Sequence, residues 1–256
     1  MQDLTVSLVQ LDIFWENPER NIQHMNSLLG RQAMGDVVIL PEMFGSGFSM
    51  NVENVAQPMS GSLLQALRGW AFDHQKLFMG TIAVLENGVA TNRLFAAFPD
   101  GKLQWYDKRH LFAMAKEDQF YTAGKERLII DYLGWKICPL ICYDLRFPVF
   151  SRNTDAYDLL IYVANWPGKR ISAWDALLTA RAIENQCYVV AVNRVGVDGN
   201  GWEFPGHSQI INPMGERILM AQPKEEIALG KISAQLLKTT RESLPFLQDR
   251  DNFELK

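Results

Sequence analysis

The sequence predicts an α/β fold, and two observations lead to this class. Segments with apolar residues at helical spacing alternate with short aliphatic runs, such as residues 36–40 and 158–163, that are typical of strands covered on both faces. Three further strands follow one another directly, separated by turn signals at Asn87-Gly88 and Asp100-Gly101. Strands that alternate with helices, with a few hairpins inserted, indicate a layered α/β sandwich.

The first half of the chain begins with a predicted strand at residues 4–11. Asn17-Pro18 then opens a helix that we expect to run to about Met34. Apolar positions at helical spacing predict a second helix, which begins at Ser60-Gly61-Ser62 and ends near Lys76. The strands expected in this half are residues 4–11, 36–40, 77–85, 92–98 and 103–106.

The second half is predicted to contain a buried strand at residues 135–141 that stops at Cys142, with a helix beginning near Pro148. One further helix is expected at residues 172–184. The later strands are expected at residues 158–163, 187–193, 207–211 and 226–232. The charged tail from Lys238 is a candidate for contact with a neighbouring subunit. Since no repeat, linker or low-complexity segment interrupts the chain, we expect a single domain over residues 1–256.

Composition limits the class of protein and its partners. Hydrophobic residues make up 48% of the chain and the net charge is −4, which predicts a sizeable core and argues against nucleic acid as a partner. No apolar run reaches about 18 residues and no secretory leader pattern is visible, so we expect no membrane insertion. The three cysteines lack CxxC spacing and the four histidines are scattered, which predicts neither disulfides nor a metal site and favours the cytoplasm.

Cys142 is the candidate nucleophile, because it lies where a strand turns into a helix and backbone N–H groups are free. A cysteine beside an apolar run is more often a small buried hydrophobic residue. Two charged residues at comparable strand ends, Glu42 and Lys108, favour the catalytic interpretation, since they supply a base and an oxyanion stabiliser. Ligands of α/β sheets bind outside the carboxyl ends of strands, where all three residues are expected.

Three segments resemble the signatures of the nitrilase superfamily of carbon–nitrogen hydrolases, in the order in which that family carries them. They are the strand-end glutamate in Leu40-Pro41-Glu42-Met43-Phe44, the lysine in Tyr106-Asp107-Lys108-Arg109-His110, and the cysteine in Ile141-Cys142-Tyr143-Asp144-Leu145-Arg146-Phe147-Pro148. The resemblance covers nearly the whole chain. It implies a four-layer α-β-β-α sandwich that dimerises through an outer helix layer and uses neither a metal nor an organic cofactor.

Within the superfamily, the string from Cys142 to Pro148 and the Asn-Trp-Pro at residues 165–167 look most like the omega-amidase branch. That branch implies hydrolysis of the terminal amide of 2-oxoglutaramate or 2-oxosuccinamate to ammonia and a dicarboxylate. The chain departs from many relatives at Val149, where they carry a glutamate. The family's second active-site glutamate matches Glu117, although Asp118 is adjacent.

The resemblance assigns a role to each catalytic candidate. Glu42 takes the thiol proton, Cys142 attacks the amide carbon, and Lys108 with the backbone N–H of Tyr143 holds the oxyanion. Glu117 is the second active-site acid. The candidates for substrate binding are Phe44, Phe112, Tyr143, Arg146, Asn165 and Trp166. Arg146 is as well placed to brace the turn as to contact substrate, and each aromatic ring is equally consistent with ordinary core packing.

Two alternative functions stay open. A nitrilase or an N-carbamoyl amidase would use the same Glu-Lys-Cys chemistry in a different pocket. A catalytically silent binding protein would keep the fold for partner recognition, although the presence of Glu42, Lys108 and Cys142 together argues against it.

Overall fold

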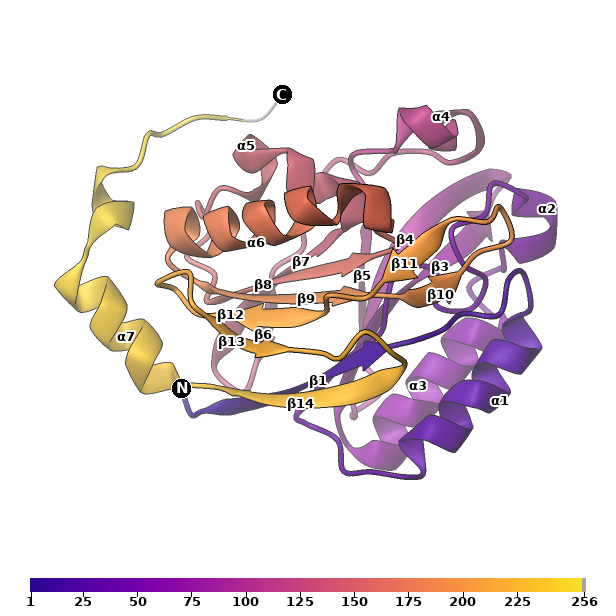
Figure 1. The fold of residues 1–256 in the computed structure, drawn as a ribbon, viewed down its shortest axis with the longest axis horizontal. Helices are drawn as coiled ribbons and strands as arrows, with labels where there is room; N and C mark the ends of the chain where they lie inside the picture. Colours follow the sequence, from indigo (N-terminus) through magenta and orange to yellow (C-terminus); the bar gives the residue numbers. More distant parts are fainter. Residues whose placement is uncertain (255–256) are drawn as a thin grey trace.

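The computed structural model describes residues 1–254 and consists of two six-stranded mixed sheets flanked by helices (Figure 1). The predicted α/β sandwich is therefore confirmed at the level of two sheets with helices outside them. Each sheet has three neighbouring parallel strands, β1-β2-β3 in the first and β7-β8-β9 in the second, and antiparallel strands extend both sides.

The first sheet combines strands from both ends of the chain. In spatial order its strands are β14 (Glu226–Ile232), β1 (Leu4–Gln10), β2 (Val37–Ile39), β3 (Leu77–Glu86), β4 (Val89–Ala97) and β5 (Leu103–Asp107). β14 pairs antiparallel with β1, with Leu4 opposite Ile232. The last strand of the chain therefore joins the sheet that the first strand begins.

The second sheet carries the cysteine turn. In spatial order its strands are β13 (Arg217–Met220), β12 (Gln209–Ile211), β9 (Tyr188–Asn193), β8 (Leu159–Ala164), β7 (Trp135–Ile141) and β6 (Ile130–Tyr132). A separate two-stranded hairpin is formed by β10 (Val195–Val197) and β11 (Glu203–Pro205).

Helices lie on the outer side of each sheet. The helices, in chain order, are α1 (Pro18–Leu29), α2 (Val52–Val55), α3 (Ser62–His74), α4 (Glu117–Phe120), α5 (Pro148–Ser151), α6 (Ile171–Asn185) and α7 (Ala234–Ser243). α1 and α3 lie side by side against the first sheet, and α6 packs against β9 and β12 of the second (Figure 1). α7 follows β14 at the end of the molecule where the N-terminus lies.

Side-chain alternation separates the core into two layers. Along β1, the side chains of Leu4, Val6 and Leu8 face the second sheet, whereas Val9 belongs to the layer between the first sheet and its helices. The cluster between the sheets is almost wholly buried and includes residues from both halves of the chain. Both sheets are thus covered on both faces, as the aliphatic strand sequences predict.

The structure corrects three details of the predicted elements. The first helix ends at Leu29 rather than near Met34, because Gly30 takes the C-cap position. The tail from Lys238 begins inside α7, whose N-cap Ser233 accepts a hydrogen bond from the N–H of Leu236. β13 was not predicted, since its residues are largely exposed and lack the aliphatic run of a buried strand.

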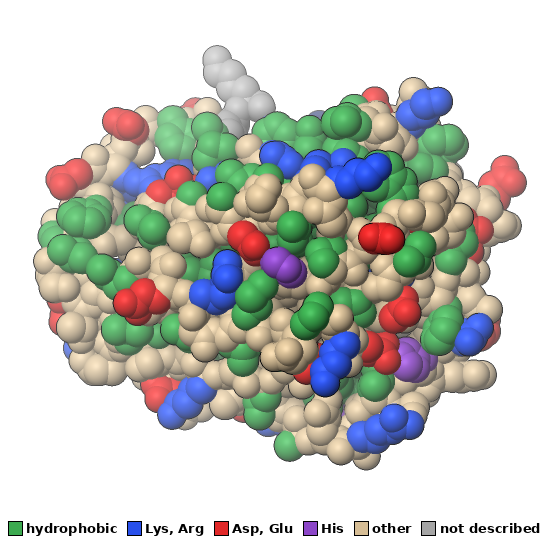
Figure 2. All heavy atoms as spheres, in the orientation of Figure 1, with side chains coloured by type: hydrophobic (Ala, Val, Ile, Leu, Met, Phe, Trp, Pro, Cys, Tyr) green, Lys and Arg blue, Asp and Glu red, His purple; other side chains and the backbone are tan. Residues whose placement is uncertain are grey.

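The surface shows no strong separation of charge in the orientation of Figure 2, where acidic and basic side chains are interspersed among apolar and polar ones. Among residues 1–254, none of the helices has both the length and the apolar character needed to cross a bilayer.

Candidate active site

Glu42 lies in a tight turn directly after β2, at the carboxyl end of the strand. The next residue, Met43, has a left-handed backbone with a φ of 45°, and its N–H donates to the Thr81 hydroxyl at 2.7 Å. The backbone of Thr81 also accepts from the N–H of Phe44. β3 therefore holds the turn from the side and fixes the direction in which the Glu42 carboxylate points.

Lys108 lies between two carboxylates, and all three side chains are fully buried. Its Nζ is 2.8 Å from Oε1 of Glu42, and 3.0 and 2.9 Å from the two oxygens of Glu117. Glu117 is the first residue of α4 and also accepts the N–H of Phe112 at 2.6 Å. The structure thus brings Glu117 to the position that the sequence suggested for the second acid.

Two asparagines complete the surroundings of Glu42. The N–H of Asn165, after β8, donates to Oε2 of Glu42 at 2.9 Å, and its side-chain nitrogen donates to the Glu42 carbonyl at 2.6 Å. Asn92 on β4 donates to Oε1 of Glu42 at 2.8 Å. Asn165 was expected to contact substrate, whereas its side-chain nitrogen is used to hold Glu42. Asn92 was not predicted at all, because nothing in the strand pattern distinguishes it.

Cys142 begins a short 3-10 helix, Cys142–Arg146, immediately after β7. Its φ of 41° is left-handed, a conformation that a non-glycine residue adopts only where the surrounding structure imposes it. The N–H of Tyr143 falls in the first turn of this helix, where backbone donors have no intrahelical acceptor. The predicted strand-to-helix turn is confirmed.

Asp144 holds the cysteine turn against the loop that carries Lys108. Its carboxylate is fully buried and accepts the N–H of Ile141 at 2.9 Å, closing the turn around Cys142. The same carboxylate accepts the Tyr106 hydroxyl at 2.7 Å, and both the backbone N–H and Nδ1 of His110, at 3.1 and 2.8 Å. Because Tyr106 and His110 flank Lys108 in sequence, Asp144 fixes the distance between the two catalytic segments.

The buried charges change the acidity of the groups around them. Burial raises the pKa of the Cys142 thiol well above its usual range, and the charge of Glu42 raises it further, while Lys108 acts in the opposite direction. Burial alone would lower the pKa of Lys108, but the charges of Glu117 and Glu42 more than offset this, so its pKa is raised. Burial also raises the pKa of Glu117, against the effect of Lys108. A neutral thiol therefore faces a buried ion cluster.

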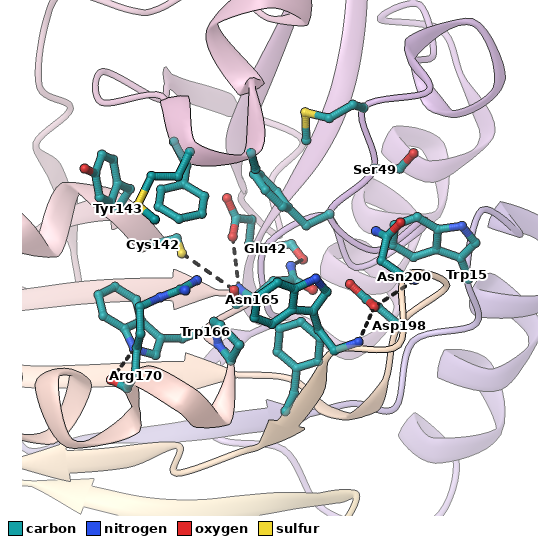
Figure 3. Close-up of a pocket in the computed structure, with 18 of the residues that line it drawn as sticks. Trp15, Glu42, Ser49, Cys142, Tyr143, Asn165, Trp166, Arg170, Asp198 and Asn200 are labelled. Atoms are coloured by element: carbon teal, nitrogen blue, oxygen red, sulfur yellow. Dashed lines mark hydrogen bonds between the residues drawn. The ribbon is translucent and has the colours of Figure 1, made fainter.

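Glu42, Lys108 and Cys142 form part of the wall of a cavity of about 850 Å³ (Figure 3). Cys142, Tyr143 and Arg170 lie toward one end in this view, and Trp15, Asp198 and Asn200 toward the other, with Glu42 and Asn165 between them. The hairpin loop after β10 contributes Asp198, Asn200 and Trp202 to the rim.

Five of the six predicted substrate-binding residues line this cavity, namely Phe112, Tyr143, Arg146, Asn165 and Trp166. Phe44 does not. Its ring is buried between the first sheet and its helices, 6.0 Å from the ring of Trp70. The prediction that Phe44 binds substrate is wrong, because its ring belongs to the layer between the first sheet and its helices and not to the cavity lining.

Two guanidinium groups line the cavity with aromatic rings beneath them. Arg146 lies 4.9 Å from the ring of Trp166, and Arg170 lies 5.1 Å from that of Phe112. Burial lowers the pKa of Arg170, although the group stays strongly basic. Within residues 1–254, neither arginine side chain has a carboxylate partner. Arg170 was missed from sequence because it lies beyond both the three signature segments and the Asn-Trp-Pro at residues 165–167.

In the described part of the chain, no three His, Cys, Asp or Glu side chains are grouped in a way that would hold a metal ion. The cation in contact with both Glu42 and Glu117 is Lys108 itself.

The fold and the buried Glu-Lys-Glu cluster beside a cysteine agree with the family assignment. The family model for carbon–nitrogen hydrolases matches residues 5–242, and the chain belongs to this family.

Individual relatives cover the chain from end to end. It is 43% identical to the omega-amidase YafV of Escherichia coli strain K12, over 100% of both chains. It is 34% identical to the 2-oxoglutaramate amidase of Bacillus subtilis strain 168, over 96% of both chains. Among solved structures it resembles XC1258 of Xanthomonas campestris, a CN-hydrolase superfamily protein with an arsenic adduct in its active site. That likeness has a TM-score of 0.95 and 42% identity over 100% of both chains.

The role of Asp144 can be tested with Asp144→Asn. In the wild type, each carboxylate oxygen of Asp144 accepts a backbone N–H, from His110 or from Ile141. In Asp144→Asn an NH₂ group replaces one of these oxygens, and one N–H then faces another donor. We expect the free energy of unfolding to fall by about 3 kcal/mol. Turnover should fall as well, because the Cys142 and Lys108 segments lose their common anchor. Chemical denaturation checks the first effect, and the exposed Asp131→Asn is the control. Wild-type stability and turnover in Asp144→Asn would contradict this role.

Proposed function

We propose that the protein is an omega-amidase, which hydrolyses the terminal amide of 2-oxoglutaramate or 2-oxosuccinamate to ammonia and the 2-oxo dicarboxylate. The observation that carries the proposal is the buried cluster of Glu42, Lys108 and Glu117 beside the Cys142 thiol at the cavity wall. The relatives named as omega-amidase and 2-oxoglutaramate amidase support the choice of substrate.

In the first half of the reaction, the thiol of Cys142 gives its proton to Glu42 as sulfur attacks the amide carbon. The tetrahedral intermediate then collapses. Its C–N bond breaks, protonated Glu42 passes the proton to the departing nitrogen, and ammonia leaves a thioester on Cys142. In the second half, Glu42 takes a proton from water as the oxygen attacks the thioester. The C–S bond then breaks, and Glu42 returns that proton to the sulfur, which restores the thiol and releases the carboxylic acid. Water is the only co-reactant, so we propose that no cofactor takes part.

Lys108 and the N–H of Tyr143 stabilise the oxyanion in this proposal. The three hydrogens of the Lys108 ammonium already have acceptors, one oxygen on Glu42 and two on Glu117. An oxyanion therefore replaces one of the two bonds to Glu117, and the remaining bonds keep the lysine in place. Glu117 then serves to hold Lys108 charged and oriented, which explains why a second carboxylate is buried here.

Substrate selection rests on Arg146 and Arg170. A 2-oxo acid with a terminal amide carries one carboxylate, and a guanidinium without an internal acid partner is suited to bind it. Both arginines line the cavity that contains Cys142, and their aromatic neighbours restrict their movement. Tyr143, Trp166 and Phe112 supply the apolar wall along the carbon chain of the substrate.

We further propose that the chain works as a single domain and as a homodimer in the cytoplasm. The cluster between the sheets, which draws on both halves of the chain, supports one domain. Exposed apolar side chains near the outer helices, Val149, Ile183 and Phe246, support association through that layer. The three cysteines are free thiols, which is consistent with a reducing compartment.

Glu42→Gln and Lys108→Ala should nearly abolish turnover. Loss of general acid–base catalysis lowers rates by roughly 10²–10⁴ and loss of one oxyanion donor by roughly 10²–10³. The measurement is ammonia release under saturating substrate, with circular dichroism to show that each variant is folded. A variant that keeps more than about a tenth of wild-type turnover, against those magnitudes, would refute the role assigned to that residue.

The substrate class is tested by ammonia release from 2-oxoglutaramate and 2-oxosuccinamate beside glutamine, asparagine, a nitrile and a carbamoyl amine. We expect preference for the 2-oxo amides in the wild type and no activity in Cys142→Ala. Preference for the nitrile or the carbamoyl compound would keep the mechanism and change the substrate. Inactivity across the panel would favour a binding protein.

Arg146→Ala and Arg170→Ala should each lower kcat/KM for 2-oxoglutaramate by about 10- to 100-fold, the range for a hydrogen bond to a charged group. An uncharged amide, such as butyramide, should be affected much less, because it has no carboxylate to lose. Lys169→Ala is the matched control, since Lys169 is adjacent to Arg170 but lies on the ring of Trp202 outside the cavity lining. Equal losses on charged and uncharged amides would show that the arginines only support the fold.

A further inference from the structure

Among residues 1–254, Asn92 is the neutral side chain that donates hydrogen bonds to both buried carboxylates. It lies on β4 opposite Ala83 of β3. The neighbouring Arg93 points to the other face of the strand and pairs with Asp107 of β5 at 2.6 and 2.9 Å. The carbonyl of Asn92 accepts the N–H of Lys108 at 3.0 Å. The β4–β5 pairing therefore places Asn92 and Lys108 side by side.

The side-chain nitrogen of Asn92 completes a closed ring of hydrogen bonds. Nδ2 is 2.8 Å from Oε1 of Glu42 and 3.2 Å from Oε1 of Glu117. Nζ of Lys108 lies 2.8 and 3.0 Å from the same two oxygens. Each of these oxygens thus accepts one hydrogen from the lysine and one from the asparagine.

The orientation of the Asn92 amide follows from its partners. With the amide turned over, its oxygen would face two carboxylate oxygens and both hydrogen bonds would be lost. In the observed orientation Oδ1 is buried and, in the described part of the chain, has no hydrogen-bond partner. An unpaired buried acceptor is unfavourable. The two hydrogen bonds that Nδ2 donates to the carboxylates therefore hold the Asn92 amide in this orientation.

The ring has a consequence for Glu42. A carboxylate oxygen has two lone-pair positions, and both positions on Oε1 are occupied by Lys108 and Asn92. Within the described residues, the hydrogen bond that Oε2 accepts comes from the N–H of Asn165, at 2.9 Å. The position left to receive a proton is therefore on Oε2.

We propose that Asn92 is a positioning residue for the hydrolysis, which keeps both buried carboxylates anionic and directs proton transfer from Cys142 to Oε2 of Glu42. The inference rests on the proposed use of Glu42 as the base. Asn92 itself contacts neither the cavity nor the reacting atoms.

The direction in which the acid limb of the pH–rate profile should move follows from the effect of hydrogen bonds on a carboxylate. Bonds donated to a carboxylate stabilise its anion, so removing them favours the protonated form of the buried carboxyl groups. The other ionisable groups that face the carboxylates are Lys108, Cys142 and Tyr121. Burial raises the pKa of both the thiol and Tyr121, and Lys108 stays charged, so none of the three loses or gains its proton on the acid side. The acid limb of the pH–rate profile therefore reports the carboxylates.

The test uses the full chain with Asn92→Leu and Asn92→Asp. The first removes both donors, and the second keeps the shape but adds a third carboxyl group. We expect the acid limb of kcat/KM for 2-oxoglutaramate to move upward by about one pH unit in Asn92→Leu and further in Asn92→Asp, with KM little changed. Asn153→Leu is the matched control, because Asn153 is equally buried and its side-chain nitrogen also donates two hydrogen bonds, but to the carbonyls of Tyr157 and Asn185 rather than to Glu42 and Glu117. It should lower the melting temperature without moving the limb.

Infrared titration of the buried carboxyl groups measures their protonation midpoint directly and needs no substrate. The bands are assigned with Glu42→Gln and Glu117→Gln. An upward shift of the protonation midpoint in both Asn92 variants supports the inference, even if wild type proves inactive on 2-oxo amides and the proposed function fails. Unchanged midpoints and an unchanged acid limb in folded variants would overturn it. If Asn92→Leu does not fold, Asn92→Ala, which removes both donors without adding a charge, decides the question.

Discussion

The burial of three charges in one contact, Lys108 between Glu42 and Glu117, is the constraint on which the rest of the structure depends. Moving ions out of water is unfavourable by several kcal/mol each, so such a cluster persists only where nearly every lone pair and hydrogen is paired. The additional donors are the side chain of Asn92 and the backbone N–H groups of Phe112 and Asn165. With one positive and two negative charges, the cluster favours a neutral Cys142 beside an anionic base, which is the state that general-base attack requires.

The two parallel strand triplets bring the pieces of the cluster together. Glu42 follows β2, Cys142 follows β7 and Asn165 follows β8, each at a carboxyl end. β5, which precedes Lys108, runs in the same direction as β3 because β4 is antiparallel to both. Face-to-face packing of the sheets then places four strand ends around one cavity, so the core that stabilises the fold also fixes the catalytic distances.

The sequence was sufficient to predict the parts of the site that lie on strand ends. The aliphatic runs before Glu42 and Cys142 have a period and a length that define where each strand stops, and the structure places both residues there. Asn92 and Arg170 were not predictable in this way, because a polar residue inside a strand or beside a helix has no local signal of what it faces. Phe44 was assigned wrongly for a related reason, since the residues around it do not show on which face of the first sheet its ring packs.

Met43 and Cys142 both have a left-handed backbone. The turn after β2 and the turn after β7 therefore each contain a residue whose backbone conformation only glycine adopts freely. Such strain amounts to about 1–3 kcal/mol for each residue. A glycine at position 142 would relieve it and would also remove the sulfur. With the nucleophile role proposed for Cys142, selection for thermal stability alone would therefore favour an inactive protein, and the cysteine would persist in this turn only while selection acts on turnover.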